Sequence, residues 1–487
     1  MPIRPKLDPE SAAANMADIA PRYTPQEAII EANRCLFCFD APCIQACPTG
    51  IDIPSFIKKI ATGNLTGSAR VILSANILGG SCARVCPTAV LCEGACVVLD
   101  REGDPVKIGR LQRYATDQAL QNRFPILKTP ARKSGRRVAV IGGGPSGLGC
   151  AAELAQLGHE VVVFEKKPNA GGLNTYGIAY YKMKPEESLA EVAMIQSLGV
   201  EIRCGVEVGR HLPVEQIQRE FDAVFVGLGL GKGARLNVPG EDLPEVVEAL
   251  EFIEQVHTHP LHQVPVGDRV AVIGGGNTAI DAVTQARRLG ARDAVIVYRR
   301  SQDEMPAYAY EQKLAMTDGA RFLFNTVPLE ILSDGSGHVT GLKLARTAST
   351  NRKVQILADS EFSEPFDMVI KAIGEEKQVN LFKKLFPALE LDNRGVVVRN
   401  SDTGQTNIPG IFAGGDCANG GREVVNAVAE GKKAARGIHV FLAGKEVTGP
   451  TQASRYGVKG PPVGSGFNRP IRVQELEREN ARKHKVT

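Results

Sequence analysis

Hydrophobic and polar positions along the chain form two similar blocks of strand and helix patterns. In residues 138–167, a β-branched run leads into a glycine-rich turn, a helix pattern of small residues, and a second apolar run, VVVFE. Residues 270–300 repeat this order of strand, turn, helix and strand. Because strands that alternate with helices favour a parallel sheet covered by helices, each block predicts a Rossmann-like α/β unit.

Further apolar runs predict how the two units are connected. Residues 221–230 and 367–377 are typical of buried strands, and residues 410–438 combine a strand pattern with an amphipathic helix. The pattern at 410–438 follows the second block in the sequence, and we expect it to complete the unit that the first block begins. We therefore expect the second unit to be nested within the first.

Before these blocks, the pattern is helical. Residues 1–22 lack periodicity and are interpreted as an arm. Thr24-Pro25-Gln26-Glu27 is a capping box with proline at the first helical position, and predicts a helix to about Arg34. Two more helical patterns, at 53–61 and 65–76, are interrupted by Gly63 and by Gly79-Gly80.

The first glycine-rich turn predicts a dinucleotide site. Gly142, Gly144 and Gly147 have the spacing that allows a tight turn, backbone approach to a pyrophosphate and close helix packing. Glu165 follows 23 residues after Gly142, where an acid can bind ribose hydroxyls. We interpret this unit as FAD-binding. Its other expected contacts are Pro145, Ser146, Gly172, Leu173, Gly415 and Asp416, where Asp416 is either a ligand of the ribityl chain or a turn-capping residue.

The second turn differs at the end of its second strand. It contains Gly274, Gly276, Asn277, Thr278 and Ala279, but the strand that would end in an acid ends instead in Arg299 and Arg300. A guanidinium binds a 2′-phosphate bidentately, whereas an acid repels it. This unit therefore predicts NAD(P)H binding with a preference for NADPH. The alternative is that both arginines are a solvated strand end.

Cysteines are concentrated between the arm and the first unit. Eight of the eleven lie within 62 residues, with the spacing C-x2-C-x4-C-x3-C-P followed by C-x3-C-P and C-x3-C. The first group resembles the ferredoxin run that binds [4Fe-4S] clusters, whereas four-cysteine zinc sites normally show two C-x2-C pairs. We expect two [4Fe-4S] clusters. The thiols are Cys35, Cys38, Cys43, Cys47, Cys82, Cys86, Cys92 and Cys96.

The remaining cysteines do not form a redox pair in the sequence. Cys150, Cys204 and Cys417 are far apart, and we expect them to be small packing residues. Because no redox-active cysteine pair is expected, we expect the flavin to pass its electrons to the clusters.

Composition and charge exclude some functions. A net charge of +4 over 487 residues is too small to indicate a nucleic-acid partner. No apolar run approaches the ~20 residues of a membrane span, and the N-terminus lacks a signal-peptide apolar region. We therefore expect a cytoplasmic protein without a membrane partner, in which cysteines serve metal or redox chemistry.

These patterns predict an α/β protein in five segments. The C-terminal segment carries eight Lys/Arg against three Glu and is interpreted as a linker or docking tail. The predicted segments are an α-helical iron-sulfur domain at 1–132, the FAD-binding domain at 133–256 and 375–449, the NAD(P)-binding domain at 257–374, and a basic tail at 450–487.

Taken together, the motifs resemble one family over nearly the whole chain. The chain is similar to the glutamate synthase small subunit and to the N-terminal half of dihydropyrimidine dehydrogenase. DAPC around Cys43, CARVCPT at 82–88 and IGRLQRYATD at 108–117 most resemble the separate NAD(P)H-oxidising subunit of the bacterial dihydropyrimidine dehydrogenase.

The resemblance implies a relay from NAD(P)H through FAD and two clusters to an FMN-containing partner that reduces uracil or thymine. The chain stops at Thr487, before an FMN barrel, so we expect no pyrimidine chemistry on this chain. The alternatives are a glutamate synthase small subunit, a stand-alone NADPH:ferredoxin-type oxidoreductase, or a non-redox scaffold with zinc and structural nucleotides.

The resemblance also implies which side chains bind each cluster. Cys35, Cys38, Cys43 and Cys96 would hold the first cluster, while Cys47 crosses to the second with Cys86 and Cys92. Cys82 is the obvious fourth ligand of the second cluster. However, Gln112 matches a glutamine that serves as a cluster ligand in dihydropyrimidine dehydrogenase. A neutral amide in place of a thiolate would make the cluster more positive and raise its potential.

Overall fold

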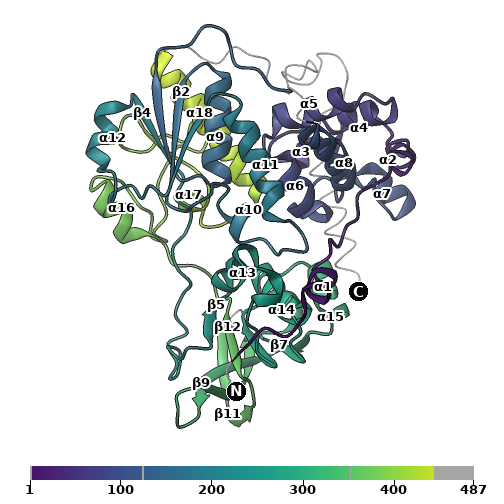
Figure 1. Cartoon of the computed structure of the whole chain (residues 1–487), viewed down its shortest axis with the longest axis vertical. Helices are drawn as coiled ribbons and strands as arrows, with labels where there is room; N and C mark the ends of the chain where they lie inside the picture. Colours follow the sequence, from purple (N-terminus) through teal and green to yellow (C-terminus); the bar gives the residue numbers. More distant parts are fainter. Residues whose placement is uncertain (1–2, 123–125, 351–352, 444–487) are drawn as a thin grey trace.

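The computed structural model describes residues 3–122, 126–350 and 353–443. Three parts are visible in Figure 1: a helical domain, an α/β domain beside it, and a second α/β domain below both. The predicted basic tail at 450–487 lies outside the described residues.

The first α/β domain is built on a five-stranded parallel sheet with the order β13-β4-β1-β2-β3. Its inner strands are buried along nearly their whole length, as expected for β-branched runs covered on both faces. Strand β13 follows all strands of the second α/β domain in the sequence, but it pairs with β4 of the first domain. The strands are β1 (Arg137–Ile141), β2 (Glu160–Glu165), β3 (Glu201–Cys204), β4 (Ala223–Val226) and β13 (Ile411–Ala413).

Helices cover both faces of this sheet. One face packs against α9 and the long helix α18, which lie side by side in Figure 1, and the other packs against α12 and α16. The helices are α9 (Pro145–Gln156), α10 (Leu173–Tyr176), α11 (Pro185–Gln196), α12 (Val214–Glu220), α16 (Val379–Leu385), α17 (Asp416–Asn419) and α18 (Val424–Ala443).

The second α/β domain also has a five-stranded parallel sheet, with the order β5-β12-β6-β7-β8. Strand β5 precedes the predicted boundary at residue 257, so that boundary was placed too late. A strand of three residues is too short to show an alternation of apolar and polar positions, so the sequence did not indicate β5. The strands are β5 (Val246–Glu248), β6 (Arg269–Ile273), β7 (Asp293–Val297), β8 (Arg321–Leu323) and β12 (Met368–Lys371), and the helices are α13 (Ala249–Thr258), η2 (Leu261–Gln263), α14 (Asn277–Arg288), η3 (Gln302–Glu304) and α15 (Ala309–Thr317).

A three-stranded antiparallel sheet, which the sequence patterns did not predict, extends from the second domain (Figure 1). Its strands are β9 (Thr326–Ser333), β10 (Val339–Thr350) and β11 (Lys353–Glu364). Leu342 and Leu344 of β10 pack with Val295 and Val297 of the parallel sheet, so the two sheets share one core.

The helical domain confirms the expected N-terminal helices. The side chain of Thr24 accepts a hydrogen bond from the amide of Glu27, whose carboxylate accepts one from the amide of Thr24. The helices are α2 (Pro25–Ala32), α3 (Pro42–Ala46), α4 (Ile53–Ala61), α5 (Leu65–Ala75), α6 (Gly79–Val85), η1 (Thr88–Val90), α7 (Val97–Glu102) and α8 (Ile108–Gln121).

The N-terminal arm belongs spatially to the second α/β domain. It contains a short helix, α1 (Pro9–Asn15), that the sequence did not predict. Arg4 pairs with Val266 in a β-bridge, and Met16 is buried in the core of that domain. The predicted helical domain at 1–132 therefore includes an arm that lies on another domain.

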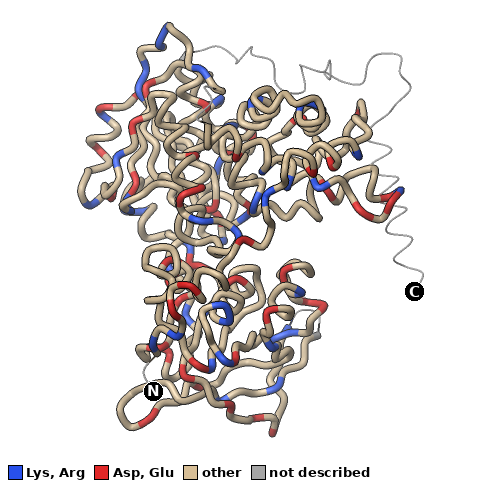
Figure 2. The backbone as a smooth tube through the Cα atoms, turned by 45° about the vertical axis from the view of Figure 1, so that its right-hand side comes forward, with Lys and Arg blue, Asp and Glu red and all other residues tan. Residues whose placement is uncertain are grey.

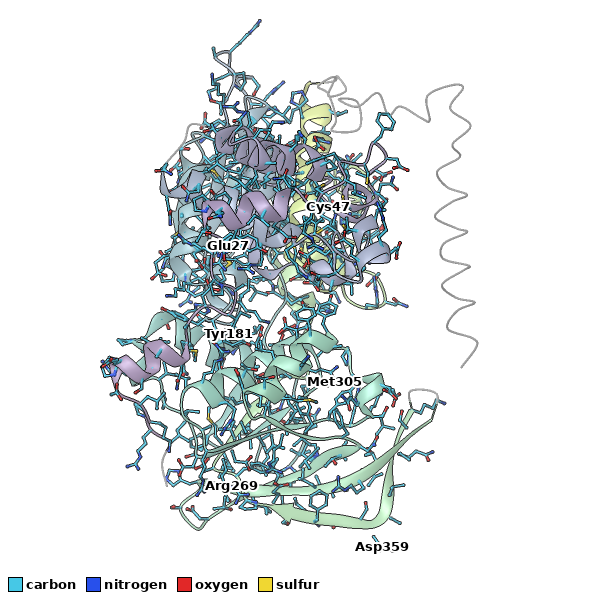
Figure 3. All side chains as sticks on the ribbon, turned by 90° about the vertical axis from the view of Figure 1, so that its right-hand side faces the viewer. Glu27, Cys47, Tyr181, Arg269, Met305 and Asp359 are labelled. Atoms are coloured by element: carbon cyan, nitrogen blue, oxygen red, sulfur yellow. The ribbon has the colours of Figure 1, made fainter. Side chains whose placement is uncertain are left out.

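Charges of both signs are distributed over all three parts (Figure 2). Within the residues that the structure describes, no helix is long and apolar enough to cross a membrane. Figure 3 shows Tyr181 at the junction of the second α/β domain with the other two. Its hydroxyl donates to Asp281 at 3.1 Å, which ties a loop of the first α/β domain to α14.

Candidate cofactor sites

The turn after β1 leaves its backbone open toward a ligand. Gly142 has a φ of +105°, and a Cβ there would lie 2.3 Å from the carbonyl oxygen of Gly227. By contrast, the nearest protein atom to a Cβ on Gly144 would be 3.9 Å away. The fold itself therefore requires Gly142, whereas Gly144 leaves room in front of α9, where Pro145 and Ser146 begin the helix.

Glu165 ends β2 beside this turn. Its Oε2 accepts a hydrogen bond from the amide of Gly143 at 2.8 Å, and its Oε1 accepts one from the amide of Lys167 at 2.8 Å. The carboxylate is buried, so its orientation is fixed. Because a carboxylate accepts up to about four hydrogen bonds, it retains capacity for ribose hydroxyls.

The other predicted contacts of the first unit meet at the same end of the sheet. A Cβ on Gly172 would lie 2.7 Å from the Cα of Gly144, and one on Gly415 would lie 2.5 Å from the Oγ of Ser146. Leu173 and Asp416 follow these two glycines as the first residues of α10 and α17. Segments from both sides of the second domain therefore line one site.

Burial raises the pKa of Asp416 above its usual value, and the nearby charge of Glu430 adds to the rise. Its Oδ1 accepts a hydrogen bond from the amide of Arg422 at 3.2 Å. A carboxyl group held near the turn in this way is suited to accept a hydrogen bond from a hydroxyl-bearing ligand.

The second glycine turn has the same construction. Gly274 has a φ of +146°, and a Cβ there would lie 2.1 Å from the carbonyl oxygen of Ala372. A Cβ on Gly276 would have nothing within 4 Å. Asn277 accepts a hydrogen bond from the amide of Tyr308 at 3.0 Å, and Ala279 is buried against the sheet.

A cavity in front of this turn contains a residue that sequence reasoning missed. Gly276, Thr278 and Lys371 line it together with Glu248 and Glu375. The ammonium of Lys371 lies 2.7 Å from Glu248, and 2.8 Å from Glu241. Burial opposes the charge, but the two carboxylates raise the pKa of Lys371 above its usual value. The available signal was a lysine within the apolar run at 367–377, where it ends strand β12.

Strand β7 ends at Val297, and Arg299 and Arg300 follow it after Tyr298, whereas the predicted strand ends in the two arginines. The Arg299 side chain is exposed and Arg300 is half-buried. The hydroxyls of Ser349 and Ser301 lower the pKa of Glu304, and the charge of Arg300 lowers it further. The carboxylate of Glu304 therefore lies near Arg300 of the predicted phosphate-binding pair. The sequence did not reveal this neighbour.

Four of the eight cysteines surround one cavity in the helical domain. Cys35, Cys38, Cys43 and Cys96 line it, and its other walls are mainly aliphatic side chains of α4, of α7 and of the segment that leads into α8. Burial raises the pKa of Cys43 to about 12, and the charges of the other three thiols add to this effect. Burial raises the pKa values of Cys35 and Cys38 as well.

The other four thiols lie together on the side that faces the α/β domains. The neighbouring thiol of Cys82 and burial raise the pKa of Cys86, with smaller effects of Cys47 and Cys92. The Cys86 charge also acts on Tyr308 of the second α/β domain, and that of Cys47 acts on the half-buried Lys432 of α18. Cys47 is labelled in Figure 3.

Cys82 belongs to this second group, and Gln112 contacts the start of α6, the helix that carries Cys82. The sulfur of Cys82 is buried and accepts a hydrogen bond from the amide nitrogen of Asn76 at 3.1 Å. Gln112 is buried on α8, and its Nε2 donates to the carbonyl oxygen of Gly79 at 2.7 Å. Both residues thus contact the α6 region, and Asn76 is a further contact that spacing did not reveal.

Two groups of four thiols fit iron-sulfur clusters in number and surroundings. Among the described residues, no three Cys, His, Asp or Glu side chains converge on one point as the ligands of a single ion would. A [4Fe-4S] cube binds each thiolate through a different iron, so its ligands surround a volume. The raised pKa values of Cys35, Cys38, Cys43, Cys86 and Cys92 mean that thiolates at these positions need a compensating cation, which the iron of a cluster would supply.

The three other cysteines are also free thiols. Cys150 and Cys417 are buried, in agreement with a packing role, whereas Cys204 is exposed at the end of an edge strand. The interpretation of Cys204 as a packing residue was therefore wrong. The sequence of a four-residue strand does not reveal whether the strand lies at the edge of its sheet.

Comparisons with known proteins match both parts of this arrangement. Residues 136–431 match the family described as pyridine nucleotide-disulphide oxidoreductase, and residues 12–124 match the one described as dihydropyrimidine dehydrogenase domain II, 4Fe-4S cluster.

Relatives of two kinds are similarly close. The chain is 36% identical over 460 residues to the glutamate synthase [NADPH] small chain of Halomonas elongata, covering 90% of this chain and 96% of that one. It is 34% identical over 427 residues to the NAD-dependent dihydropyrimidine dehydrogenase subunit PreT of Escherichia coli K12, covering 88% and 97%.

A solved structure shares the fold. Mycobacterium tuberculosis FprA in complex with NADPH superposes with a TM-score of 0.52 at 20% identity, covering 64% of this chain and 85% of that one. At this identity the likeness concerns the fold alone.

Proposed function

Because the chain belongs to the family of glutamate synthase small subunits and PreT-like subunits, and is an NAD(P)H-dependent flavin and iron-sulfur oxidoreductase, we propose that it is the electron-input subunit of a dihydropyrimidine dehydrogenase. It takes a hydride from NAD(P)H and delivers single electrons to an FMN-containing partner, which reduces uracil or thymine. The motifs at 40–43, 82–88 and 108–117 favour this partner.

The observation that carries the relay is the order of the two thiol groups. Cys47, Cys82, Cys86 and Cys92 lie toward the α/β domains, next to Tyr308 and Lys432, whereas Cys35, Cys38, Cys43 and Cys96 line a separate cavity. Bound FAD would supply hydride acceptance, and bound [4Fe-4S] clusters would supply one-electron transfer. We assign the inner group, with either Cys82 or Gln112 as the fourth ligand, to the second cluster and the outer group to the first.

Within this proposal each site residue has a binding role. The turn with Gly142, Gly144 and Gly147 accommodates the FAD pyrophosphate, and Glu165 accepts ribose hydroxyls. Gly276 and Thr278 border the coenzyme pyrophosphate, while Arg299 and Arg300 bind the 2′-phosphate of NADPH. Lys371 lines the coenzyme cavity, and its ion pairs with Glu241 and Glu248 hold its side chain in place.

A second candidate is a glutamate synthase small subunit, which the Halomonas elongata relative favours. The same relay would then deliver electrons to a different large subunit. The residues that bind FAD, NAD(P)H and the clusters are the same in both candidates, so the partner distinguishes them.

The test is purification of the chain at native levels, with identification of the polypeptide that co-purifies and with iron and FAD counting. We expect one FAD and about eight irons per chain, as two [4Fe-4S] clusters require, and a partner that contains FMN and reduces pyrimidines. A glutamate synthase large subunit would support the second candidate instead. A colourless zinc protein would overturn both.

A further inference from the structure

Helix α6 carries Cys82 and is followed directly by Cys86, yet its own sequence does not cap it. The residue before it is Leu78, which makes no side-chain capping hydrogen bond. Helix starts are usually capped by a local Ser, Thr, Asp or Asn, because the first amides lack partners within the helix. The amides at the start of α6 must therefore find acceptors elsewhere.

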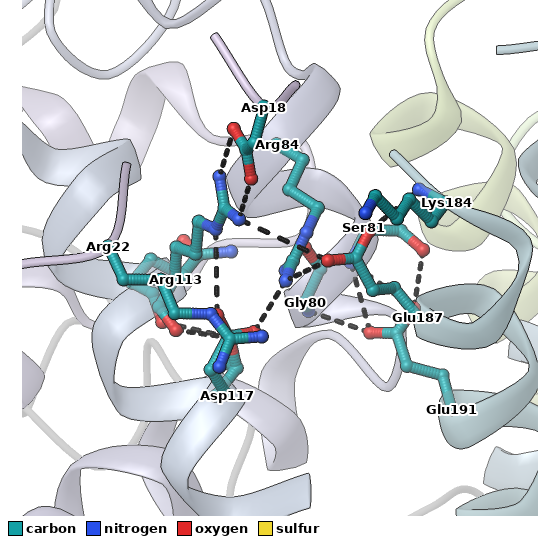
Figure 4. A network of polar contacts seen from close by, with 12 residues as sticks. Asp18, Arg22, Gly80, Ser81, Arg84, Arg113, Asp117, Lys184, Glu187 and Glu191 are labelled. Carbon is teal, nitrogen blue, oxygen red and sulfur yellow. Dashed lines mark hydrogen bonds and ion pairs between the residues drawn. The ribbon is translucent and has the colours of Figure 1, made fainter. Parts of the chain in front are cut away.

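The acceptor is Glu191, which lies on α11 of the first α/β domain (Figure 4). Its Oε1 accepts hydrogen bonds from the amide of Gly80 at 2.7 Å and from that of Ser81 at 3.1 Å. Its Oε2 accepts a further hydrogen bond from the Ser81 hydroxyl. Glu191 is only 1% exposed, so the carboxylate is enclosed with these donors.

Gly80 is shaped for this contact. A Cβ at that position would lie 2.9 Å from the Oε1 of Glu191, closer than a carbon atom can approach without displacing the carboxylate. The Gly79-Gly80-Ser81 sequence before Cys82 therefore matches a carboxylate that comes from another domain, 110 residues along the chain.

A network of buried charges holds α11 and the helical domain in register (Figure 4). Arg84 of α6 forms ion pairs with Asp117 of α8 at 2.7 Å and with Glu187 of α11 at 2.9 Å. Arg113 of α8 is paired with Asp18 of the N-terminal arm and lies 3.5 Å from Asp117. Arg84 already forms ion pairs with two carboxylates, those of Asp117 and Glu187. Its single positive charge therefore does not neutralise Glu191 as well.

We propose that Glu191 is a positioning residue for the second iron-sulfur site. It fixes α6, with Cys82 and Cys86, against the FAD-binding domain, and its negative charge lowers the reduction potential of the cluster held there. The inference rests on the proposed function, because that function assigns these cysteines to a cluster. Glu191 is hydrogen-bonded to Ser81, the residue before Cys82. A charge so close to a cluster ligand changes the reduction potential of the cluster electrostatically, as other groups around the ligands do.

The test compares three variants by iron and FAD content and by an EPR-monitored redox titration at pH 8.5. Glu191→Gln keeps one acceptor oxygen for the amides of Gly80 and Ser81 but removes the charge, whereas Glu191→Ala removes the cap. Glu186→Gln, an exposed position on the same helix, is the matched control. The alkaline pH is chosen because burial raises the pKa of Glu191 to about 7.

We expect Glu186→Gln to match the wild type. Glu191→Gln should keep its iron and titrate at a more positive potential in the second cluster, and Glu191→Ala should lose about half of its iron while retaining FAD, as loss of one of two four-iron clusters requires. Unchanged iron and unchanged potentials in both Glu191 variants, with eight irons in the wild type, would overturn this inference alone. A wild type with only four irons would overturn the two-cluster proposal as well.

Discussion

The hydroxyl of Tyr308 donates a hydrogen bond to Glu423 across 2.8 Å, and so joins the coenzyme domain to the FAD-binding domain. The amide of the same tyrosine donates to Asn277 in the second glycine turn. One residue thus connects the expected position of the coenzyme pyrophosphate to the domain that receives the hydride.

Tyr308→Phe should therefore slow flavin reduction by NAD(P)H without loss of FAD. A single hydrogen bond is worth about 1 kcal/mol, so we expect a decrease of about fivefold in the rate of flavin bleaching measured by stopped flow. The matched control is Tyr310→Phe, whose exposed ring stacks on Tyr308 at 5.7 Å. An unchanged rate in Tyr308→Phe would contradict a role for this contact in presenting the coenzyme.

Coenzyme choice is tested at Arg299 and Arg300. Replacing both with alanine should raise KM for NADPH and leave KM for NADH nearly unchanged, because only NADPH carries the 2′-phosphate. Each lost charge-assisted contact is worth about 1.5–3 kcal/mol. Arg292→Ala, at an exposed site at the opposite end of β7, serves as the control. Equal losses with both coenzymes would refute the assignment.

The fourth ligand of the second cluster is tested by exchanging its two candidates. If Gln112 is the ligand, Cys82→Ser keeps about eight irons and both potentials, because two complete [4Fe-4S] clusters remain. Gln112→Leu should then lose or shift the second cluster in iron counting and redox titration. The reverse pattern would assign the ligand to Cys82, whose sulfur already accepts a hydrogen bond from Asn76.

A pH dependence is expected at His159, which is buried between Ser134 and His439. Burial and the neighbouring His439 lower the pKa of His159 to about 4. Between pH 6.5 and 4 the unfolded chain binds a proton that the folded chain does not, so stability decreases as the pH falls through this window. The loss between pH 7 and pH 5 should be about 2 kcal/mol.

The measurement compares the unfolding midpoint of the wild type with that of His159→Gln at both pH values, because the difference cancels effects shared by the two proteins. The variant should lose less stability on acidification. His259→Gln, at an exposed site, should behave as the wild type does. An equal pH dependence in all three proteins would contradict the expected shift.

The glycine turns could be predicted because their requirements are local. Gly142 and Gly274 adopt positive φ next to a neighbouring carbonyl, and the adjacent strand and helix patterns identify the context. The grouping of the cysteines followed from spacing and from family resemblance, since each segment is short.

Contacts between distant segments could not be predicted. Glu191 occupies an ordinary position in the middle of a helix, and only the packing of α11 on α6 makes it a capping group. Lys371 depends on Glu241 and Glu248, which lie more than 120 residues away. Strand β5 is too short to produce a pattern, and its place in the sheet is set by pairing with β12.

The central claim, electron input to a pyrimidine-reducing partner, is tested most directly by anaerobic assay of the purified chain with NADPH and uracil, with and without an FMN-containing pyrimidine-reducing subunit. The account predicts that the chain alone reduces an artificial dye but forms no dihydrouracil, and that dihydrouracil appears when the partner is added. Dihydrouracil formed by this chain alone, or none formed with the partner while dye reduction persists, would contradict it.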